Sequence, residues 1–362
     1  MVAMIASEVR EALIRLSVAG ARCDELLTLI GNTEEFERFL SRGSWTAISH
    51  IPPRLRDKVD KWMKRDLSRA FSLIERQCVQ ILVIGDDFYP EALALTERPP
   101  VVLYALGDLH LLENVSLSVV GARKHTDYGQ RMCEKFVRSI AEAGVCIVSG
   151  LALGIDKIAH TAALDVDGKT IAVLGNGIGA CYPASNRHTY ERILKGGLVL
   201  SEYPPFTTPK PFRFPERNRI IAALADGVLV VEAKERSGSL ITARLAGEMG
   251  KEVFSICGNL DSVYSKGTNA LIRDGAQIVL DPKNILESAV YQGVRPLATP
   301  QREDLTLEEK EIYDSIKNGY QNAEALSEKT SLEIAEVLTL LTMLELKNYI
   351  SGADGDSIEI IE

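Results

Sequence analysis

The chain has 362 residues, of which 46% are hydrophobic, and a formal net charge of −9 at pH 7. This length is sufficient for a large core and predicts more than one domain. Residues 1–16 lack the apolar core of a signal peptide, and no apolar run approaches the roughly 20 residues that span a bilayer. We therefore expect a cytoplasmic protein without membrane insertion.

The cysteine and histidine residues argue against a metal centre and a disulfide framework. The six cysteines include no CxxC pair, and the five histidines show neither HxH nor HExxH spacing. Cys146 and Cys257 fall inside apolar runs, where a reduced thiol behaves as a small hydrophobic side chain. We expect no metal and no cofactor.

The negative charge is concentrated at the end of the chain. Residues 304–362 contain 14 Asp and Glu against 4 Lys, a net charge of −10, which leaves residues 1–303 at +1. An even spread of −9 would argue against a nucleic-acid partner. The larger part of the protein is instead neutral, and an acidic module follows it.

In chain order, residues 1–75 predict a helical N-terminal module, because apolar residues recur at spacings of three to four. Apolar runs then alternate with stretches of helical length over residues 76–290, which predicts an α/β fold with a doubly wound, mostly parallel sheet. The runs are 79–85, 101–107, 116–121, 145–150, 170–175, 197–202, 227–233, 252–257 and 276–280.

Residues 291–303 contain two prolines and little periodicity, so they predict a linker. Residues 304–362 predict helices followed by a small hairpin, the pattern of a winged-helix-like module. The candidate recognition helix, 331–346, has three glutamates and no lysine or arginine. A helix entering the major groove approaches many phosphates, so we expect this module to bind a protein or shield a basic groove rather than read DNA.

The stretch VCIVSGLALGIDKIAH, residues 145–160, predicts a buried central strand that leads through a loop of small residues into a helix. Three further strands are followed by similar small or basic residues, at 121–124, at 175–179 and at 236–239, where Arg236 precedes Ser237. Taken alone, such glycines only allow tight turns. Because parallel strands share their carboxyl edge, four loops together predict an anion-binding groove. Its candidate residues are Gly121, Arg123, Lys124, Ser149, Gly150, Gly154, Gly175, Gly177, Ser237, Gly238 and Ser239.

The segment from Lys210 to Arg219, KPFRFPERNR, interleaves four cations with two phenylalanines. Single-stranded nucleic acid needs charges that follow its phosphates and ring faces for its unstacked bases. The alternative is that the phenylalanines are core residues and that the arginines pair with Glu216, Glu232 or Glu235. We favour arginines that face the groove, which adds Lys210, Arg213, Arg217, Asn218 and Arg219 to the candidate site.

Enzyme motifs are absent or out of context. Residues 175–180 match GxGxxG/A by letter, but they follow a late strand and run into Pro183, which does not fit a dinucleotide-binding turn. The sequence has no GxxxxGK[ST] and no GxSxG. Glu202 or Glu232 would be the carboxylate of a nucleotide-cleaving enzyme of the lysine-decarboxylase-like phosphoribohydrolase type, but no PGGxGT-like motif is present. A nucleotide-sensing interaction module is a further alternative.

Several blocks together resemble the bacterial DNA-processing protein A family, also called DprA or Smf. The resemblance covers about residues 80–285 and is carried by VVGARKHTDYG, VSGLALGIDKIAH, TIAVLGNGIGACYPASN, LVLSEYPP, FPERNRIIAALADGVLVVEA and RSGSLITARLA. It implies an extended Rossmann-like domain that binds single-stranded DNA, forms a homodimer and helps load the RecA recombinase in natural transformation. The family is not known as an enzyme.

The resemblance assigns the DNA-phosphate contact of the family's G-x-R loop to Arg123, preceded by Gly121. Ala184 stands where several relatives have a DNA-binding lysine, and Leu153 stands where many have a basic residue. Both departures remove positive charge from the groove. Lys124 or Arg187 is then the candidate compensating cation, and Asn186 and Arg187 join the candidate DNA-binding set.

Overall fold

The structure is a computed structural model that describes residues 6–45, 50–292, 305–317, 319–320, 322–330, 332–347, 349–351 and 358–360. Most of the predicted linker, 291–303, lies outside these residues. The chain divides into two compact units, residues 1–297 and 298–362. In the described part of the chain, no helix is both long and apolar enough to cross a membrane.

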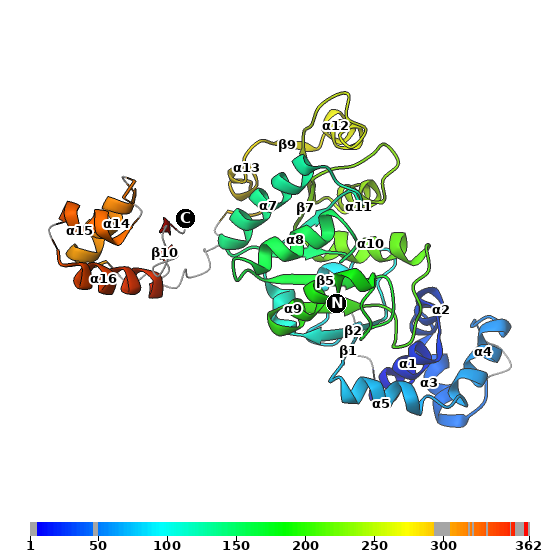
Figure 1. Cartoon of the computed structure of the whole chain (residues 1–362). Coiled ribbons are helices and arrows are strands. Elements are labelled where there is room, and N and C mark those ends of the chain that lie inside the picture. Colours follow the sequence, from blue (N-terminus) through cyan, green and yellow to red (C-terminus); the bar gives the residue numbers. More distant parts are fainter. Residues whose placement is uncertain are drawn as a thin grey trace. The chain divides into compact units, whose positions relative to one another are not determined.

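A nine-stranded sheet forms the centre of the first unit (Figure 1), in the order β1-β2-β6-β5-β4-β3-β7-β8-β9. Strand β2 pairs antiparallel with β1 and with β6, and the other pairings are parallel. The nine strands coincide with the nine predicted runs, which confirms the doubly wound, mostly parallel sheet. They are β1 (Gln80–Val83), β2 (Val102–Gly107), β3 (Ser116–Val120), β4 (Cys146–Ser149), β5 (Thr170–Leu174), β6 (Leu198–Ser201), β7 (Gly227–Val230), β8 (Glu252–Ile256) and β9 (Gln277–Val279).

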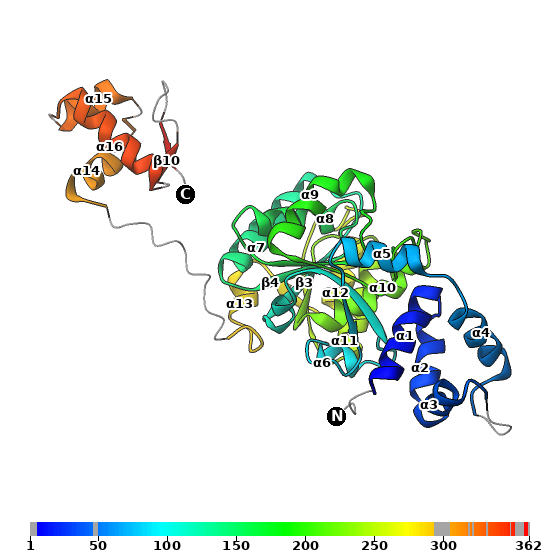
Figure 2. The same ribbon diagram turned by 90° about the horizontal axis from the view of Figure 1, so that it is seen from below.

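Helices cover both faces of the sheet, so the strands at its centre are buried throughout. Leu117 and Val119 of β3 pack with helices α7 and α8, whereas Val120 packs with α10 and α11. Figure 2 shows α8 and α9 on one side and α6 and α11 on the other. The helices are α6 (Glu91–Ala94), η1 (Leu109–Glu113), α7 (Asp127–Glu142), α8 (Ile155–Leu164), η2 (Ala184–Asn186), α9 (Arg187–Gly196), α10 (Arg213–Leu224), α11 (Gly238–Glu248), α12 (Lys266–Arg273) and α13 (Lys283–Leu286).

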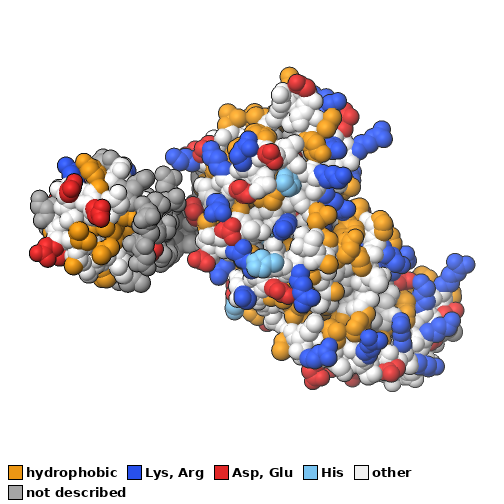
Figure 3. Space-filling view, viewed as in Figure 1, with side chains coloured by type: hydrophobic (Ala, Val, Ile, Leu, Met, Phe, Trp, Pro, Cys, Tyr) orange, Lys and Arg blue, Asp and Glu red, His pale blue; other side chains and the backbone are white. Residues whose placement is uncertain are grey.

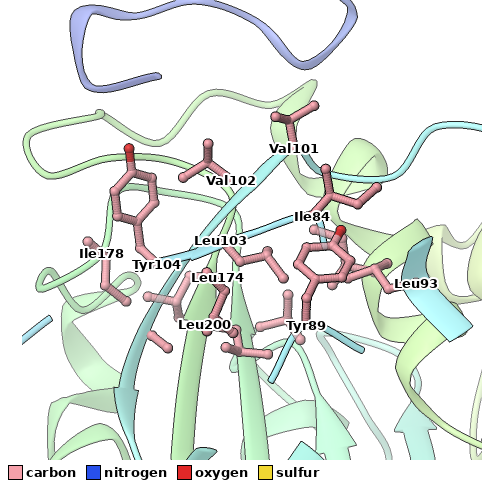
Figure 4. Packing of buried hydrophobic residues seen from close by; sticks show 14 of the residues in the cluster. Ile84, Tyr89, Leu93, Val101, Val102, Leu103, Tyr104, Leu174, Ile178 and Leu200 are labelled. Carbon is pink, nitrogen blue, oxygen red and sulfur yellow. The ribbon is translucent and has the colours of Figure 1, made fainter. Parts of the chain in front are cut away.

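Among the described residues that precede the sheet, five helices occupy the stretch for which the sequence predicts a helical module. The Arg10 guanidinium pairs with Asp86 at 2.8 Å, and the buried Tyr104 hydroxyl donates to Ser17 Oγ at 2.8 Å. The core of the module is therefore continuous with that of the sheet, where Leu103 and Tyr104 lie near Leu174 and Leu200 (Figure 4). The helices are α1 (Ser7–Ala19), α2 (Cys23–Ile30), α3 (Thr33–Arg42), α4 (Pro53–Met63) and α5 (Ser68–Arg76).

The second unit has the three helices and the hairpin of a winged helix. Its core includes Ile312, Leu326, Val337 and Leu341, and a buried ion pair joins Lys347 to Glu309 at 2.8 Å. The two short strands pair antiparallel, as predicted for the tail of the chain. The elements are α14 (Leu307–Lys317), α15 (Ala323–Thr330), α16 (Ile334–Leu346), β10 (Ile350–Ser351) and β11 (Glu359–Ile360).

Candidate nucleic-acid interface

A cavity of about 340 Å³ opens at the carboxyl edge of the sheet. Strands β3 and β7 are neighbours and parallel, so the loops that follow them come together there. The amino-terminal turns of α10 and α11 close the cavity, and such turns present free backbone N–H groups. Eight of the candidate residues line it: Gly121, Arg123, Lys124, Arg217, Asn218, Ser237, Gly238 and Ser239.

Arg123 combines positive charge with an aromatic surface at this cavity. Its side chain is exposed, and its guanidinium carbon lies 5.3 Å from the ring centroid of Phe214. The ring of Tyr182, 46% exposed, lies 5.7 Å from that of Phe214. Phosphates and unstacked bases would therefore meet a cation and two rings within one short stretch of surface.

One cation at the cavity, Lys234, was missing from the predicted loops, whereas its neighbour Arg236 was part of them. Lys234 and Arg236 are exposed, line the cavity, and lie in the loop between β7 and α11. With Arg123 and Lys124 they place four exposed positive charges around one opening. The sequence contains the information needed to predict Lys234. The predicted buried strand 227–233 is followed by a lysine and an arginine, in the segment AKERSGS at the same edge of the sheet.

Arg217 does not face the groove in the way the sequence predicted. It is 3% exposed, and its Nη1 donates to the backbone oxygens of Gly150, at 2.7 Å, and Val173. Burial lowers the pKa of Arg217 to about 10, and Asp156 opposes that shift. Burial also raises the pKa of the Asp156 carboxyl, which Arg217 partly offsets. Arg217 therefore supports the floor of the cavity by binding the loop after β4 and the end of strand β5.

Arg219 is likewise a structural residue, so the prediction that it faces the groove is wrong. Its Nη2 pairs with Glu202 Oε1 at 2.5 Å, and the side chains are 14% and 12% exposed. Burial lowers the pKa of Arg219, but Glu202, assisted by Cys23 and Tyr203, offsets this and leaves that pKa above its ordinary value. The alternative, that this arginine forms an ion pair with a glutamate, is correct for Arg219. The partner is Glu202, however, and not Glu216, Glu232 or Glu235.

The loop after β4 is held in place by Asn186, which is fully buried. Its Nδ2 donates to the backbone oxygens of Leu151, at 2.9 Å, and Ala152, at 3.1 Å. Leu151 has a φ of 52° and Gly154 a φ of 79°, so this loop passes through the left-handed region twice. The buried Ser149 hydroxyl donates to Val119 O at 2.6 Å. Ser149 and Asn186 are therefore buried residues that hold this loop in its conformation by hydrogen bonds, and they do not face the cavity opening.

Close approach explains three other candidate glycines. A Cβ on Gly154 would lie 2.3 Å from the Ala122 oxygen, so only glycine lets this loop approach the loop of Arg123. A Cβ on Gly175 would lie 2.8 Å from the ring of Phe214, and one on Gly177 would lie 2.5 Å from the Pro204 oxygen. Gly150, whose carbonyl receives Arg217, belongs to the same supporting layer. These glycines allow the loops around the cavity to pack closely against one another and against Phe214.

The remaining candidate cations lie away from this cavity. Arg187 is exposed and pairs with Glu191 at 2.8 Å, and Lys210 is exposed in the loop before α10. Arg213 stacks 4.9 Å from the ring centroid of Tyr203 and lines a second cavity of about 980 Å³ between the helical module and the sheet. The structure therefore distributes the Lys210 to Arg219 segment over two cavities and the core.

The carboxylates that a nucleotide-cleaving enzyme would use are engaged in structure. Glu232 is 2% exposed and accepts hydrogen bonds from the backbone N, at 2.9 Å, and the hydroxyl, at 2.5 Å, of Thr126, the N-cap of α7. Glu202 is paired with Arg219. No cluster of three or more His, Cys, Asp and Glu side chains suited to a metal ion occurs among the residues that the structure describes.

Comparison of the sequence with known proteins finds matches to one family. The family model of DNA recombination-mediator protein A matches residues 80–290, and that of the DprA winged helix domain matches residues 296–356. Protein Smf of Escherichia coli is 37% identical over 306 residues, which cover 82% of each chain. DNA processing protein DprA of Streptococcus pneumoniae is 46% identical over 203 residues, or 56% of this chain and 72% of that one.

Two solved structures agree. The X-ray structure of DprA from Streptococcus pneumoniae aligns with a TM-score of 0.67 and 35% identity, covering 79% of this chain and 99% of that one. The DprA structure from Helicobacter pylori, described for its single-stranded DNA binding mode, aligns with a TM-score of 0.53 and 34% identity, covering 57% and 94%. The chain therefore belongs to the DNA recombination-mediator protein A family, also called DprA or Smf.

Proposed function

We propose that this protein binds single-stranded DNA at the cavity between the β3 and β7 loops and helps load the RecA recombinase onto it. The observation that carries the proposal is Arg123, an exposed cation 5.3 Å from the ring of Phe214 and surrounded by Lys124, Lys234 and Arg236. Cations follow phosphates and rings stack on bases, so this surface suits a flexible strand better than a duplex.

The proposal assigns no catalytic step to the protein. The two carboxylates considered for nucleotide cleavage, Glu202 and Glu232, are held by Arg219 and Thr126. In this proposal the protein covers the single-stranded DNA and makes it available to RecA. Its effect on RecA is then measured as a shorter lag before RecA hydrolyses ATP on single-stranded DNA. A lag of unchanged length would contradict the loading part of the proposal.

We further propose a homodimer that forms through the edge strand β9. Its Ile278 is 45% exposed and the following Leu280 is 69% exposed, so the edge presents apolar side chains beside backbone groups that β8 does not pair. Such an edge favours pairing with a second chain.

Binding of labelled oligo-dT of increasing length, with and without excess mononucleotide, tests the proposed ligand. A surface for a strand gains affinity with length and resists the mononucleotide, and its log affinity falls with log salt at roughly −0.7 per neutralised phosphate. A nucleotide-sensing pocket of about 340 Å³ would show neither the length dependence nor the resistance. Equal affinity for duplex would also contradict the proposal.

A further inference from the structure

Phe206, in the loop after β6, adopts a backbone conformation that large side chains rarely occupy. Its φ is 66°, in the left-handed region, and the residue is 52% exposed. The strain is therefore not compensated by complete burial of the ring. Residues with strained backbone conformations cluster at functional sites, including sites that hold ligands.

A second cation–aromatic pair includes this ring. The Arg69 guanidinium carbon, on α5 of the helical module, lies 4.8 Å from the Phe206 centroid, and Arg69 is exposed. The arrangement repeats that of Arg123 and Phe214, at 5.3 Å. Two sites of the same composition therefore lie on different parts of the first unit.

Contacts along the sheet edge connect the two pairs. Tyr182, in the loop after β5, lies 5.7 Å from Phe214. The Gly177 backbone N in that same loop donates to the oxygen of Thr207, the neighbour of Phe206, at 2.8 Å. Strands β3, β4, β5 and β6 are consecutive in the sheet, so Arg123 and Phe206 follow strands about 14 Å apart. That span is longer than one nucleotide.

Positive charge continues from Arg69 over the helical module. Residues 53–77, which hold α4 and α5, contain eight Lys and Arg against four Asp and Glu, a net charge of +4 in a chain of −9. Figure 3 shows Lys and Arg side chains gathered over the region of α1–α5 at its lower right. The exposed cations of α4, α5 and the turn between them include Arg54, Lys61, Lys64, Arg69 and Arg76.

We propose that the DNA strand leaves the Arg123 cavity, crosses Tyr182 and Phe206, and continues over Arg69 onto α4 and α5. The helical module is then the second part of the DNA interface. The inference rests on the proposed function, because it extends the same bound strand. Exposed rings beside the cations favour a single strand, whose base faces are available, over a duplex or an acidic protein.

The test compares Arg69→Ala and Phe206→Gly in the full chain. Phe206→Gly removes the ring and also relieves the left-handed strain, so it should not lower the melting temperature. Phe206→Tyr keeps the ring and should bind as the parent protein does. The matched control is Arg38→Ala, which removes an exposed cation of the same module from α3, a helix that packs against α1 and α2.

Anisotropy is measured with oligo-dT of about 6 and about 24 nucleotides, the first near the lower end of the usual range of single-strand site sizes and the second above that range. Arg69→Ala and Phe206→Gly should bind the long strand about fivefold or more weakly and the short strand normally. Arg69→Ala should also reduce the salt slope on the long strand by about 0.7.

The outcomes separate this inference from the proposed function. If Arg123→Ala weakens both lengths while Arg69→Ala and Phe206→Gly match Arg38→Ala on the long strand, the extension over the helical module is wrong and the cavity assignment stands. If the parent protein binds neither length, or if Arg123→Ala changes neither affinity, the proposed function itself fails. Weaker binding by Phe206→Gly together with a lower melting temperature than the parent would also overturn the extension.

Discussion

The ion pair between Arg219 and Glu202 should contribute to stability rather than to DNA affinity. Both side chains are nearly buried, at 14% and 12% exposure, and 2.5 Å separates Arg219 Nη2 from Glu202 Oε1. Arg219→Ala leaves a buried carboxylate without its cation, which costs about 3–5 kcal/mol. That is a large fraction of the 5–15 kcal/mol by which domains are typically stable, and it should lower the melting temperature by roughly 10 °C.

Urea unfolding measures this effect in the full chain. Both tryptophans, Trp45 and Trp62, belong to the helical module, so their fluorescence follows that module while far-UV circular dichroism follows the whole fold. Arg219→Met combined with Glu202→Leu removes both charges and should recover most of the loss. Oligo-dT affinity of Arg219→Ala below its transition should stay within about twofold of the parent, because the guanidinium is paired with Glu202 and nearly buried and so cannot contact a phosphate.

A cost below about 1 kcal/mol for Arg219→Ala would refute this reasoning, because that is the value of a solvent-screened surface pair. A large loss of DNA affinity at unchanged stability would do so too. That result would support the sequence-based prediction that Arg219 faces the groove and contacts DNA.

Three further predictions concern other parts of the chain. Burial, assisted by Arg217, lowers the pKa of His160 from 6.5 to about 3. Between these two pH values only the unfolded chain takes up this proton, so stability should fall by about 1.4 kcal/mol for each pH unit of acidification. His160→Gln should flatten that segment of the pH profile of urea midpoints, and an unchanged slope would contradict the assignment. A chain ending at Gln301 should bind oligo-dT at least as tightly as the full chain, since residues 304–362 carry −10, and a clear loss of affinity with the first unit still folded would show that the acidic module contacts DNA. Ile278→Lys with Leu280→Lys should give a monomer by light scattering, and a parent protein that is itself monomeric, or a variant that remains dimeric, would refute the β9 interface.

The sequence was sufficient to predict the strands and the sheet edge at which the cavity opens. Each of the nine runs is apolar and bounded by turn residues, so period and length identify it without tertiary information. Parallel strands share one carboxyl edge, which is why the loops of Arg123 and Ser237 were expected together. Their meeting at one cavity depends on the neighbouring positions of β3 and β7, which sequence order does not reveal.

The roles of the α10 arginines required the structure. Arg217 and Arg219 lie two residues apart in a segment that reads as a uniform basic patch, yet one binds backbone oxygens and the other binds Glu202. The partners come from β4, β5 and β6, so no local pattern reports them. The left-handed φ of Phe206 and its contact with Arg69 are equally nonlocal, because they join residues 137 positions apart. Local patterns thus predicted the loops but not which of their side chains reach solvent.

The most direct test of the central claim is the affinity of Arg123→Ala for labelled single-stranded oligo-dT, with Arg244→Ala as the matched control. Arg244 is an exposed arginine on α11 that pairs with Glu248 and does not line the cavity. A charged hydrogen bond to phosphate is worth about 1.5–3 kcal/mol, so Arg123→Ala should bind roughly 10- to 150-fold more weakly at unchanged melting temperature, while Arg244→Ala binds as the parent does. Equal affinities of the two variants would contradict the assignment of the DNA site to the Arg123 cavity.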